Sequence, residues 1–278
     1  MPIVSVIIPT YNREKYMQKA LDSVFFQTFQ DFEIIVVDDG STDNTKSILE
    51  PYIKEDRVKY IYQQNLRVSK ARNNGIKNSS GKYIALLDSD DYWLDSQKLE
   101  KQVNYFENNK DVVLTSGGII RITENGEVLS KILNPESNKD LRENMLLSCL
   151  FTPSGAMFKR ELWDKIGGFN EKSDLSEDWE FFMELGKYGS FYNFQDYFVA
   201  YLQGNQNRSN FNRRANLKYN LGLIKKYKDL YPNFKKAYRV HFFYYVYSFL
   251  PFKNALLPLA SKVKEVLFGN PAYKKIYK

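Results

Sequence analysis

Residues 33–43 join an apolar run, two carboxylates and a turn in direct succession: Glu33-Ile34-Ile35-Val36-Val37-Asp38-Asp39-Gly40-Ser41-Thr42-Asp43. The apolar part shows no polar alternation, which is typical of a strand covered on both faces in a parallel sheet. Gly40 and the small polar residues after it indicate a turn and the start of a helix. The stretch therefore predicts a buried strand that ends in two carboxylates at the edge of a sheet.

The same order of strand and helix repeats over the first 110 residues. Strand patterns occupy residues 4–8, 33–37, 58–62 and 83–87, and helix patterns occupy 14–26, 48–53, 69–77 and 98–106. This alternation predicts an α/β fold with a mostly parallel, doubly wound sheet and helices on both faces. Ligands of such sheets bind beyond the carboxyl ends of the strands. Polar clusters at residues 9–13, 38–43 and 88–91 each follow a strand, so we expect them to meet at one edge.

The pattern changes after residue 110. Strand patterns at 112–116, 119–123, 128–132, 156–158 and 198–202 are interspersed with helix patterns at 141–150, 160–166 and 177–187. Asn125-Gly126, between two of these strands, is a strong hairpin signal. We therefore expect a domain over residues 1–205, with halves at 1–110 and 111–205, and a helical extension at 206–278.

The charge of the chain is divided unevenly. Residues 1–200 carry 24 Lys/Arg and 31 Asp/Glu, whereas residues 201–278 carry 16 Lys/Arg and two Asp/Glu, a local net charge of +14. Such a basic segment indicates an anionic partner. Cys149 is the one cysteine among 278 residues, which excludes an intramolecular disulfide and favours a reducing compartment. No signal peptide and no apolar stretch of membrane-spanning length is evident, so we expect a cytoplasmic location.

Three carboxylates gather in Asp88-Ser89-Asp90-Asp91, directly after a predicted strand. Like charges this close disfavour burial unless a cation or hydrogen-bond donors compensate them. Carboxylate oxygens are the ligands that Mg²⁺ and Mn²⁺ accept, and one or two of them suffice when the ion also bridges a diphosphate. The alternative is a solvated acidic turn that caps the next helix.

Two further acidic clusters suit either a binding or catalytic role or the capping of a helix. Asp39, just past a strand, is placed to accept hydrogen bonds from a nucleobase or a ribose, while Ser41 and Asp43 suit the N-terminus of the following helix. Glu177 and Asp178 open a predicted helix, where the helix dipole favours negative charge. A carboxylate there also suits a general base that activates an acceptor hydroxyl.

Seven motifs occur in a fixed order: residues 4–12, 27–29, 36–43, 71–76, 88–91, 167–169 and 177–178. Together they resemble the family 2 glycosyltransferases, the large inverting group with the GT-A fold. The resemblance covers residues 3–205. It implies that 1–205 is the catalytic domain, with a nucleotide-binding half at 1–110 and an acceptor-side half at 111–205.

The resemblance implies a donor site for a UDP-sugar. Pro9, Tyr11 and Asp39 match the positions that hold the uracil and ribose, with Tyr11 stacking on the base and Asp39 accepting from its ring NH. Arg72 matches a basic residue near the nucleotide. Asp88 matches a position that contacts the ribose or the donor sugar.

The same resemblance implies a metal ion and a catalytic base. Asp90 and Asp91 match the Asp-X-Asp-type element that holds Mn²⁺ or Mg²⁺, and we expect Asp91 to be the more direct ligand. Asp178 matches the base that deprotonates the acceptor hydroxyl, which then attacks the anomeric carbon opposite the diphosphate. The metal takes up charge on the leaving diphosphate.

Two positions depart from the family pattern. Family members often carry a His where this chain has Gly204, and here the only His is His241, which we expect to be packed or at the surface. Arg67 stands where the family commonly has Gly. Four nearby polar side chains are candidates to replace the missing His at the phosphates: Gln203, Asn205, Asn207 and Arg208.

The extension at 206–278 interleaves Lys and Arg with aromatic residues, a pattern that suits an anionic bilayer surface. This favours a peripheral location at the inner face of the cell membrane, with a glycan or lipid-linked acceptor and a role in bacterial surface polysaccharide or glycolipid synthesis. The alternative is a helical cap with solvated lysines. We set nucleic acid aside because no recognised nucleic-acid module is present.

Two other functions compete with sugar transfer. A sugar nucleotidyltransferase would share the sheet and the metal, but it typically has a Gly-rich loop where this chain has Pro9-Thr10-Tyr11-Asn12-Arg13. A non-catalytic nucleotide- or sugar-binding scaffold is compatible with Gly204. The sequence leaves the donor sugar, the acceptor and the oligomeric state open.

Overall fold

The computed structural model describes residues 1–173, 175–203, 213–250 and 274–277. The strands are β1 Val4–Thr10, β2 Phe32–Asp38, β3 Lys59–Tyr62, β4 Tyr83–Leu86, β5 Tyr92–Trp93, β6 Val112–Ile122, β7 Val128–Leu133, β8 Met157–Lys159, β9 Ser190–Leu202 and β10 Lys274–Tyr277. The helices are α1 Met17–Phe25, α2 Thr45–Lys54, α3 Val68–Lys77, α4 Lys98–Asn108, α5 Asn138–Asn144, α6 Arg160–Ile166, α7 Glu177–Leu185, α8 Arg213–Lys226 and α9 Phe234–Tyr247, with a short 3₁₀ turn at Pro153–Gly155.

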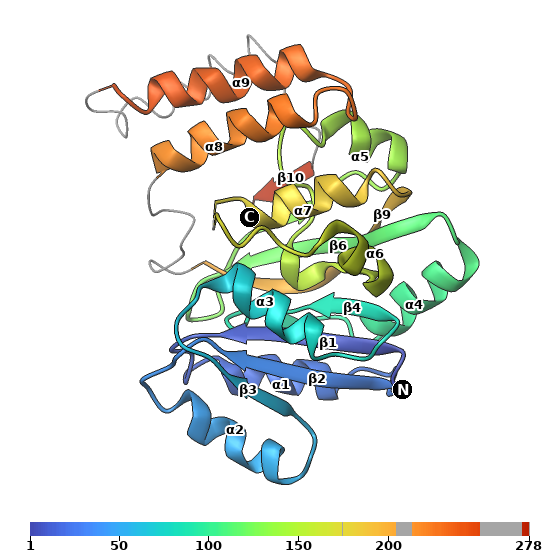
Figure 1. The fold of residues 1–278 in the computed structure, drawn as a ribbon, viewed down its shortest axis with the longest axis vertical. Coiled ribbons are helices and arrows are strands. Elements are labelled where there is room, and N and C mark those ends of the chain that lie inside the picture. Colours follow the sequence, from blue (N-terminus) through green and yellow to red (C-terminus); the bar gives the residue numbers. More distant parts are fainter. Residues whose placement is uncertain (174, 204–212, 251–273, 278) are drawn as a thin grey trace.

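These strands form one mixed sheet in the order β10-β7-β6-β8-β4-β1-β2-β3, with β9 beside β6 and β5 beside β9. β3, β2, β1 and β4 run parallel, while β8 pairs antiparallel with both β4 and β6. Because β1, β2 and β4 are parallel, their carboxyl ends lie at the same edge (Figure 1). The α/β fold class expected from the sequence is therefore confirmed.

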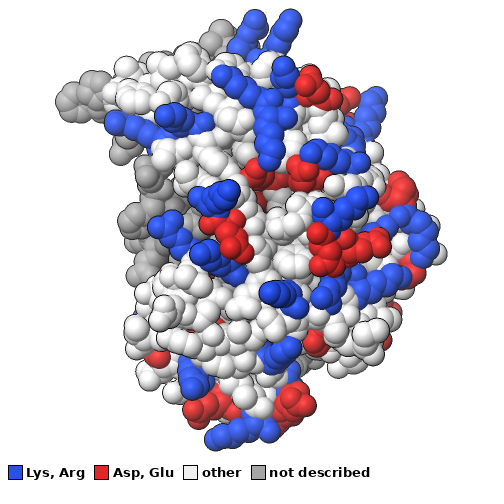
Figure 2. Space-filling view, viewed as in Figure 1, with Lys and Arg blue, Asp and Glu red and all other residues white. Residues whose placement is uncertain are grey.

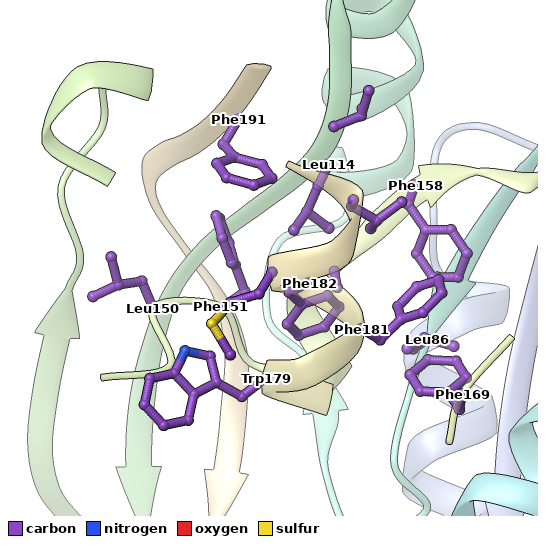
Figure 3. Close-up of a cluster of buried hydrophobic side chains, with 14 of the residues drawn as sticks. Leu86, Leu114, Leu150, Phe151, Phe158, Phe169, Trp179, Phe181, Phe182 and Phe191 are labelled. Carbon is purple, nitrogen blue, oxygen red and sulfur yellow. The ribbon is translucent and has the colours of Figure 1, made fainter. Parts of the chain in front are cut away.

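Helices cover both faces of the sheet, as the strand sequences require. Successive residues of β1 point to opposite sides, so Val6 joins a core with α1, α2 and α4, whereas Ile7 joins a core with α3, α5, α6 and α7. Figure 3 shows the aromatic part of the second core. There the Phe181 ring of α7 lies 5.0 Å from Phe158 and 4.3 Å from Phe169, between ring centroids. This packing fixes α7 against the sheet.

The second half of the sheet differs from the expected strands in two ways. β6 is one strand over Val112–Ile122 rather than two, and it forms the expected hairpin with β7 around Gly126. β9 begins at Ser190, eight residues before the predicted start, because it pairs in parallel with β6 along its length. Such a pairing between distant segments leaves no local signal. Gly117 lies where a Cβ would come 2.5 Å from the Phe198 ring, so the two strands need a glycine there.

The C-terminal extension contains the helices that the sequence predicts. α8 and α9 form an antiparallel pair that packs on α7 (Figure 1). Leu223, Tyr227, Tyr231 and Ala237 join the same core as α7. β10, which was not expected, adds an antiparallel edge strand next to β7. Within the described residues, no helix is both long and apolar enough to cross a bilayer.

Candidate active site

A cleft of about 900 Å³ opens at the edge where β1, β2 and β4 end. Its lining includes seven residues that we identified as candidates from the sequence: Pro9, Tyr11, Asp39, Arg72, Asp88, Asp90 and Asp178. They come from segments up to 169 positions apart, and the parallel strands and the start of α7 bring them together. Asp91, the eighth residue expected to bind the donor or metal or to act as the base, does not line the cleft.

Arg72 joins the two halves of the domain beneath this cleft. Its guanidinium donates to Asp88 over 2.7 Å and to Glu177 over 2.9 Å, and the residue is 2% exposed. Burial alone would lower the pKa of Arg72, but the charges of Asp88 and Glu177 raise it above its ordinary value. The cation therefore stays charged and holds one carboxylate from each half in place.

Glu177 and Asp178 open α7 on the opposite wall. Burial, followed by the charge of Asp178, raises the pKa of Glu177 to about 7. Burial likewise raises the pKa of Asp178, and the positive charge of Arg72 opposes that shift. The Asp178 carboxylate also accepts a hydrogen bond of 2.7 Å from the Trp179 amide. A carboxylate with a raised pKa is a stronger proton acceptor once ionised, which suits a general base.

Asp91, which we expect to be the more direct metal ligand, is buried and bonded inside the protein. It is 3% exposed, its Oδ1 accepts from the Leu202 amide over 3.0 Å, and its Oδ2 accepts from the Ser154 hydroxyl over 2.5 Å. Both oxygens thus have partners inside the protein. Asp90 lines the cleft and pairs with Arg13 over 3.3 Å. Asp90 therefore lines the cleft, whereas Asp91 does not.

The donor atoms at the cleft suit a divalent cation that also has phosphate oxygens to bind. Asp88 and Asp90 present hard carboxylate oxygens, with side chains 29% and 24% exposed. Among the described residues, no group of three or more His, Cys, Asp or Glu side chains is arranged to hold a metal by itself. Two carboxylates completed by a diphosphate and water form an ordinary Mg²⁺-type site.

Asp39 is held in place by the loop after β3. Its Oδ1 accepts from the Gln63 side chain and the Leu66 amide, each over 2.7 Å, and its Oδ2 accepts from the Arg67 amide over 2.8 Å. Arg67 has φ 75°, a conformation that favours glycine. The strain at this departure from the family pattern is offset by the bond to Asp39. Tyr11, 36% exposed, stands at the cleft wall with its ring accessible.

Several residues of the site escaped the sequence analysis. Ser154 accepts from the Asp88 amide over 3.1 Å and donates to Asp91, so it fixes the acidic turn. Arg13 approaches Asp90, and Asn216 of α8 lines the cleft. Ser176, just before α7, has φ 50°, and its hydroxyl lies 2.9 Å from Asn216 Oδ1. None of these contacts has a local signal, because each joins segments far apart in the chain.

The region of the missing family His is only partly described. Gly204, Asn205, Asn207 and Arg208 lie outside the described residues, and Gln203 is exposed without lining the cleft. His241 is packed, as expected: its Nε2 is 3.1 Å from the Leu147 carbonyl oxygen and its ring lies 5.5 Å from Trp179.

Comparison with protein families gives a match to the model described as Glycosyl transferase family 2 over residues 5–167. An uncharacterized glycosyltransferase of Rickettsia prowazekii (strain Madrid E) is 30% identical over 240 residues, which are 84% of this chain and 72% of that protein. The chain spans only 21% of the length of three other Rickettsia relatives that it matches.

Solved structures share the fold at low identity. TarS 1-349 of S. aureus in complex with UDP-GlcNAc aligns with a TM-score of 0.67 and 21% identity, over 96% of this chain and 78% of that one. The mannosyltransferase PcManGT of Pyrobaculum calidifontis, in complex with GDP-Man and Mn²⁺, aligns with a TM-score of 0.63 and 18% identity, over 95% and 80% of the two chains. These similarities show that the chain shares the fold of both proteins.

Proposed function

The chain belongs to glycosyl transferase family 2, and from that premise we propose that it moves a sugar from a UDP-sugar donor to an acceptor hydroxyl with inversion at the anomeric carbon. The observation that carries the proposal is a single cleft lined by carboxylates from both walls. Asp88 and Asp90 lie on the wall formed by the strand ends, and Asp178 lies on the α7 wall. Sugar transfer needs this separation, because leaving group and nucleophile act on opposite sides of the anomeric carbon.

The donor nucleotide binds at the ends of β1 and β2. Tyr11 stacks on the base, Pro9 packs beside it, and Asp39 accepts from the base NH. Asp39 already accepts three hydrogen bonds, so its orientation is fixed before the nucleotide arrives. Arg72 acts through Asp88, whose carboxylate it holds at 2.7 Å. A UDP donor is supported by the UDP-GlcNAc complex of TarS, while the GDP-Man complex of PcManGT makes a guanine nucleotide the competing choice.

Asp178 is the general base. The ionised carboxylate takes the proton of the acceptor hydroxyl, whose oxygen forms the new bond to the anomeric carbon. The bond from that carbon to the diphosphate oxygen breaks, and the electron pair leaves with the nucleoside diphosphate. One displacement inverts the configuration. Glu177, whose pKa is raised to about 7 and which is bonded to Arg72, positions the wall rather than taking this proton.

Asp90, with Asp88 beside it, would hold Mn²⁺ or Mg²⁺. When bound, the ion supplies positive charge for the leaving diphosphate. Asp91 fixes the acidic turn at residues 88–91 through its hydrogen bonds to the Ser154 hydroxyl and the Leu202 amide. The metal-bound PcManGT supports a divalent ion in this fold, and hard carboxylate ligands suit either metal.

The acceptor is a glycan or a lipid-linked sugar, in bacterial surface polysaccharide or glycolipid synthesis. A local net charge of +14 over residues 201–278 supports peripheral attachment to an anionic membrane at its inner face. The domain division at residue 205 remains our proposal for function, although α8 and α9 share a core with α7.

Calorimetric titration of UDP with and without Mn²⁺ tests the donor site. Asp90→Asn should weaken Mn²⁺-dependent UDP binding about tenfold or more. Asp178→Asn should bind UDP like the parent chain but slow the release of UDP from UDP-sugars by about 10²-fold or more. The exposed Asp31→Asn is the matched control for a lost carboxylate and should change neither.

The same assays separate the competing functions. A non-catalytic scaffold predicts that Asp178→Asn leaves every measured property intact. A nucleotidyltransferase predicts pyrophosphate release from UTP and a sugar 1-phosphate, without UDP release from UDP-sugars. Absence of UDP binding under all conditions, with GDP binding present, would refute the uridine donor while leaving the family unchanged.

A further inference from the structure

The outward face of α9 carries a stripe that is basic at one end and apolar at the other. Lys235, Arg239, Phe242, Val246 and Phe249 follow one another at intervals of three or four residues, so they share one face of the helix and of the turn that continues it. Lys235 and Arg239 are exposed. Phe242 and Val246 are each 48% exposed, and Phe249 is 53% exposed.

The opposite face of α9 is already used for folding. Ala237, Val240 and Tyr247 are buried, and Ala237 belongs to the core shared with α7 and α8. The outward apolar side chains are therefore not a misplaced core face. With Leu250, 46% exposed, they form four large apolar groups that the fold itself leaves accessible to solvent.

The surroundings of the stripe are basic. Residues 213–250 contain nine Lys/Arg and a single acidic residue, Asp229, a net charge of +8. In Figure 2, Lys and Arg gather over the end where α9 begins, and uncharged atoms cover much of its other half. Lys225, Lys228 and Lys236 are exposed close to the basic end in sequence. The charge complements an anionic surface, and the apolar end complements a hydrocarbon layer.

The apolar end lies on the side of the hairpin that borders the cleft. Arg214 of α8 donates to the Ser248 carbonyl over 3.1 Å, and its guanidinium stands 4.7 Å from the Phe249 ring centroid. Two residues further along α8, Asn216 lines the cleft next to Ser176. A membrane that covers Phe249 therefore lies beside the α7 wall of the cleft. We call this the acceptor wall, because the proposed function places the acceptor there.

We propose that this stripe is a bilayer-docking surface: Phe242, Val246, Phe249 and Leu250 insert among the acyl chains of an anionic membrane, and Lys235 and Arg239 bind its phosphate headgroups. The proposal identifies the surface through which the chain would contact the membrane. Only its statement about the acceptor rests on the proposed function. Docked this way, the acceptor wall faces the lipid surface, and the matching acceptor is anchored in that lipid.

Other occupants fit the stripe less well. A nucleic acid would meet the basic end but would leave four apolar side chains in water. A second copy of the chain would bring two α8–α9 regions, each with a net charge of +8 over residues 213–250, into the same interface. A bilayer satisfies both ends at once, because its headgroups and acyl chains lie at different depths.

Co-sedimentation of the full chain with phosphatidylglycerol/phosphatidylcholine vesicles tests the proposal. The parent chain should bind these vesicles and bind pure phosphatidylcholine much more weakly. Phe242→Ser combined with Phe249→Ser should lower binding about tenfold or more. Lys235→Glu combined with Arg239→Glu should lower binding to the anionic vesicles to a similar extent, and high salt should mimic this loss.

Matched controls sit far from the stripe. Phe26→Ser, at a side chain 78% exposed, and Lys54→Glu on α2 should bind vesicles like the parent chain. Thermal melting establishes that each variant is folded. A tryptophan placed by Phe249→Trp should be quenched by brominated acyl chains more strongly than one placed by Lys235→Trp.

The outcomes separate this proposal from the transferase proposal, because vesicle binding needs no turnover. Asp178→Asn should bind vesicles unchanged. The proposal is overturned if the parent chain does not bind anionic vesicles, or if the double Phe variant binds as well as the parent. A dimer in solution that the double Phe variant dissociates, with no vesicle binding, would assign the stripe to a second copy instead.

Discussion

Replacing Arg72 with methionine should destabilise the protein in a way that grows with pH. The substitution keeps a long apolar stem but removes a guanidinium that is 2% exposed and bonded to both Asp88 and Glu177. Removing one partner of a buried ion pair costs about 3–5 kcal/mol of unfolding free energy. The side chains of Asp88 and Glu177 are 29% and 12% exposed, so we expect the lower part of that range, about 3 kcal/mol near pH 7.

The pH dependence follows from Glu177. In the parent chain its pKa is raised from 4.5 to about 7, so its contribution to stability is present below pH 4.5 and is lost as pH rises to about 7. Without Arg72 the pKa of Glu177 rises further, because the opposing positive charge is gone. The variant should then go on losing about 1.4 kcal/mol per pH unit above pH 7, where this group no longer changes the stability of the parent.

Urea unfolding followed by circular dichroism at pH 5.5, 7 and 8 would measure both effects. Lys54→Met is the control, because Lys54 pairs with Glu50 at 4.0 Å and is 79% exposed, so its loss should cost under about 1 kcal/mol. If Arg72→Met is no more destabilising than Lys54→Met, or shows the same slope above pH 7 as the parent chain, the buried bridge does not carry the stability assigned to it.

Two further substitutions test buried packing against the sheet. Gly81→Ala should cost about 1–3 kcal/mol, because its Cβ would lie 2.6 Å from the Ser5 nitrogen. Chemical denaturation should show this loss, whereas Gly222→Ala in α8, where an added Cβ meets nothing within 4 Å, should show none. Burial lowers the pKa of Lys98, so its charge costs stability at neutral pH and this cost fades as pH rises towards 10.5. Lys98→Met should therefore raise unfolding stability by about 1 kcal/mol at pH 7 but not at pH 10, and a drop at pH 7 would show that the bond to Gln102 outweighs the buried charge.

Local patterns were enough to predict β1 to β4 and the helices between them, although not the short strand β5. The apolar runs that became β1, β2 and β4 are continuous and short, and the helices between them keep helical spacing. Their parallel order then places the residues after each strand at one edge. That is why Tyr11, Asp39 and Asp88, chosen from sequence alone, line one cleft.

The different surroundings of Asp90 and Asp91 could not be predicted in the same way. Both are equally acidic and adjacent, and the difference comes from Ser154 and Leu202, which lie 63 and 111 residues away and hold Asp91 in the interior. The family pattern supplied a cluster but not the direction in which each carboxylate points. Side-chain orientation depended on contacts that form only after the sheet has assembled.

Glu177 shows a second limit of sequence reasoning. An acidic pair at a helix start suits a dipole effect, and that interpretation accounts for the composition without any partner. The structure instead pairs Glu177 with Arg72, 105 residues away, and leaves Asp178 as its neighbour on the cleft wall. Nothing near either residue in the sequence signals that pairing.

Two tyrosine hydroxyls of the C-terminal helical region hold α7 in place. Tyr219 of α8 and Tyr227, directly after α8, donate to Glu180 and Glu184 of α7, each over 2.6 Å. The helix that carries Asp178 is therefore held by residues beyond the family match at 5–167. The donor-side residues at the ends of β1, β2 and β4 lie within that match. Under the proposed function, changes in α8 would therefore alter the wall that carries Asp178 and leave the donor-side residues at the strand ends in place.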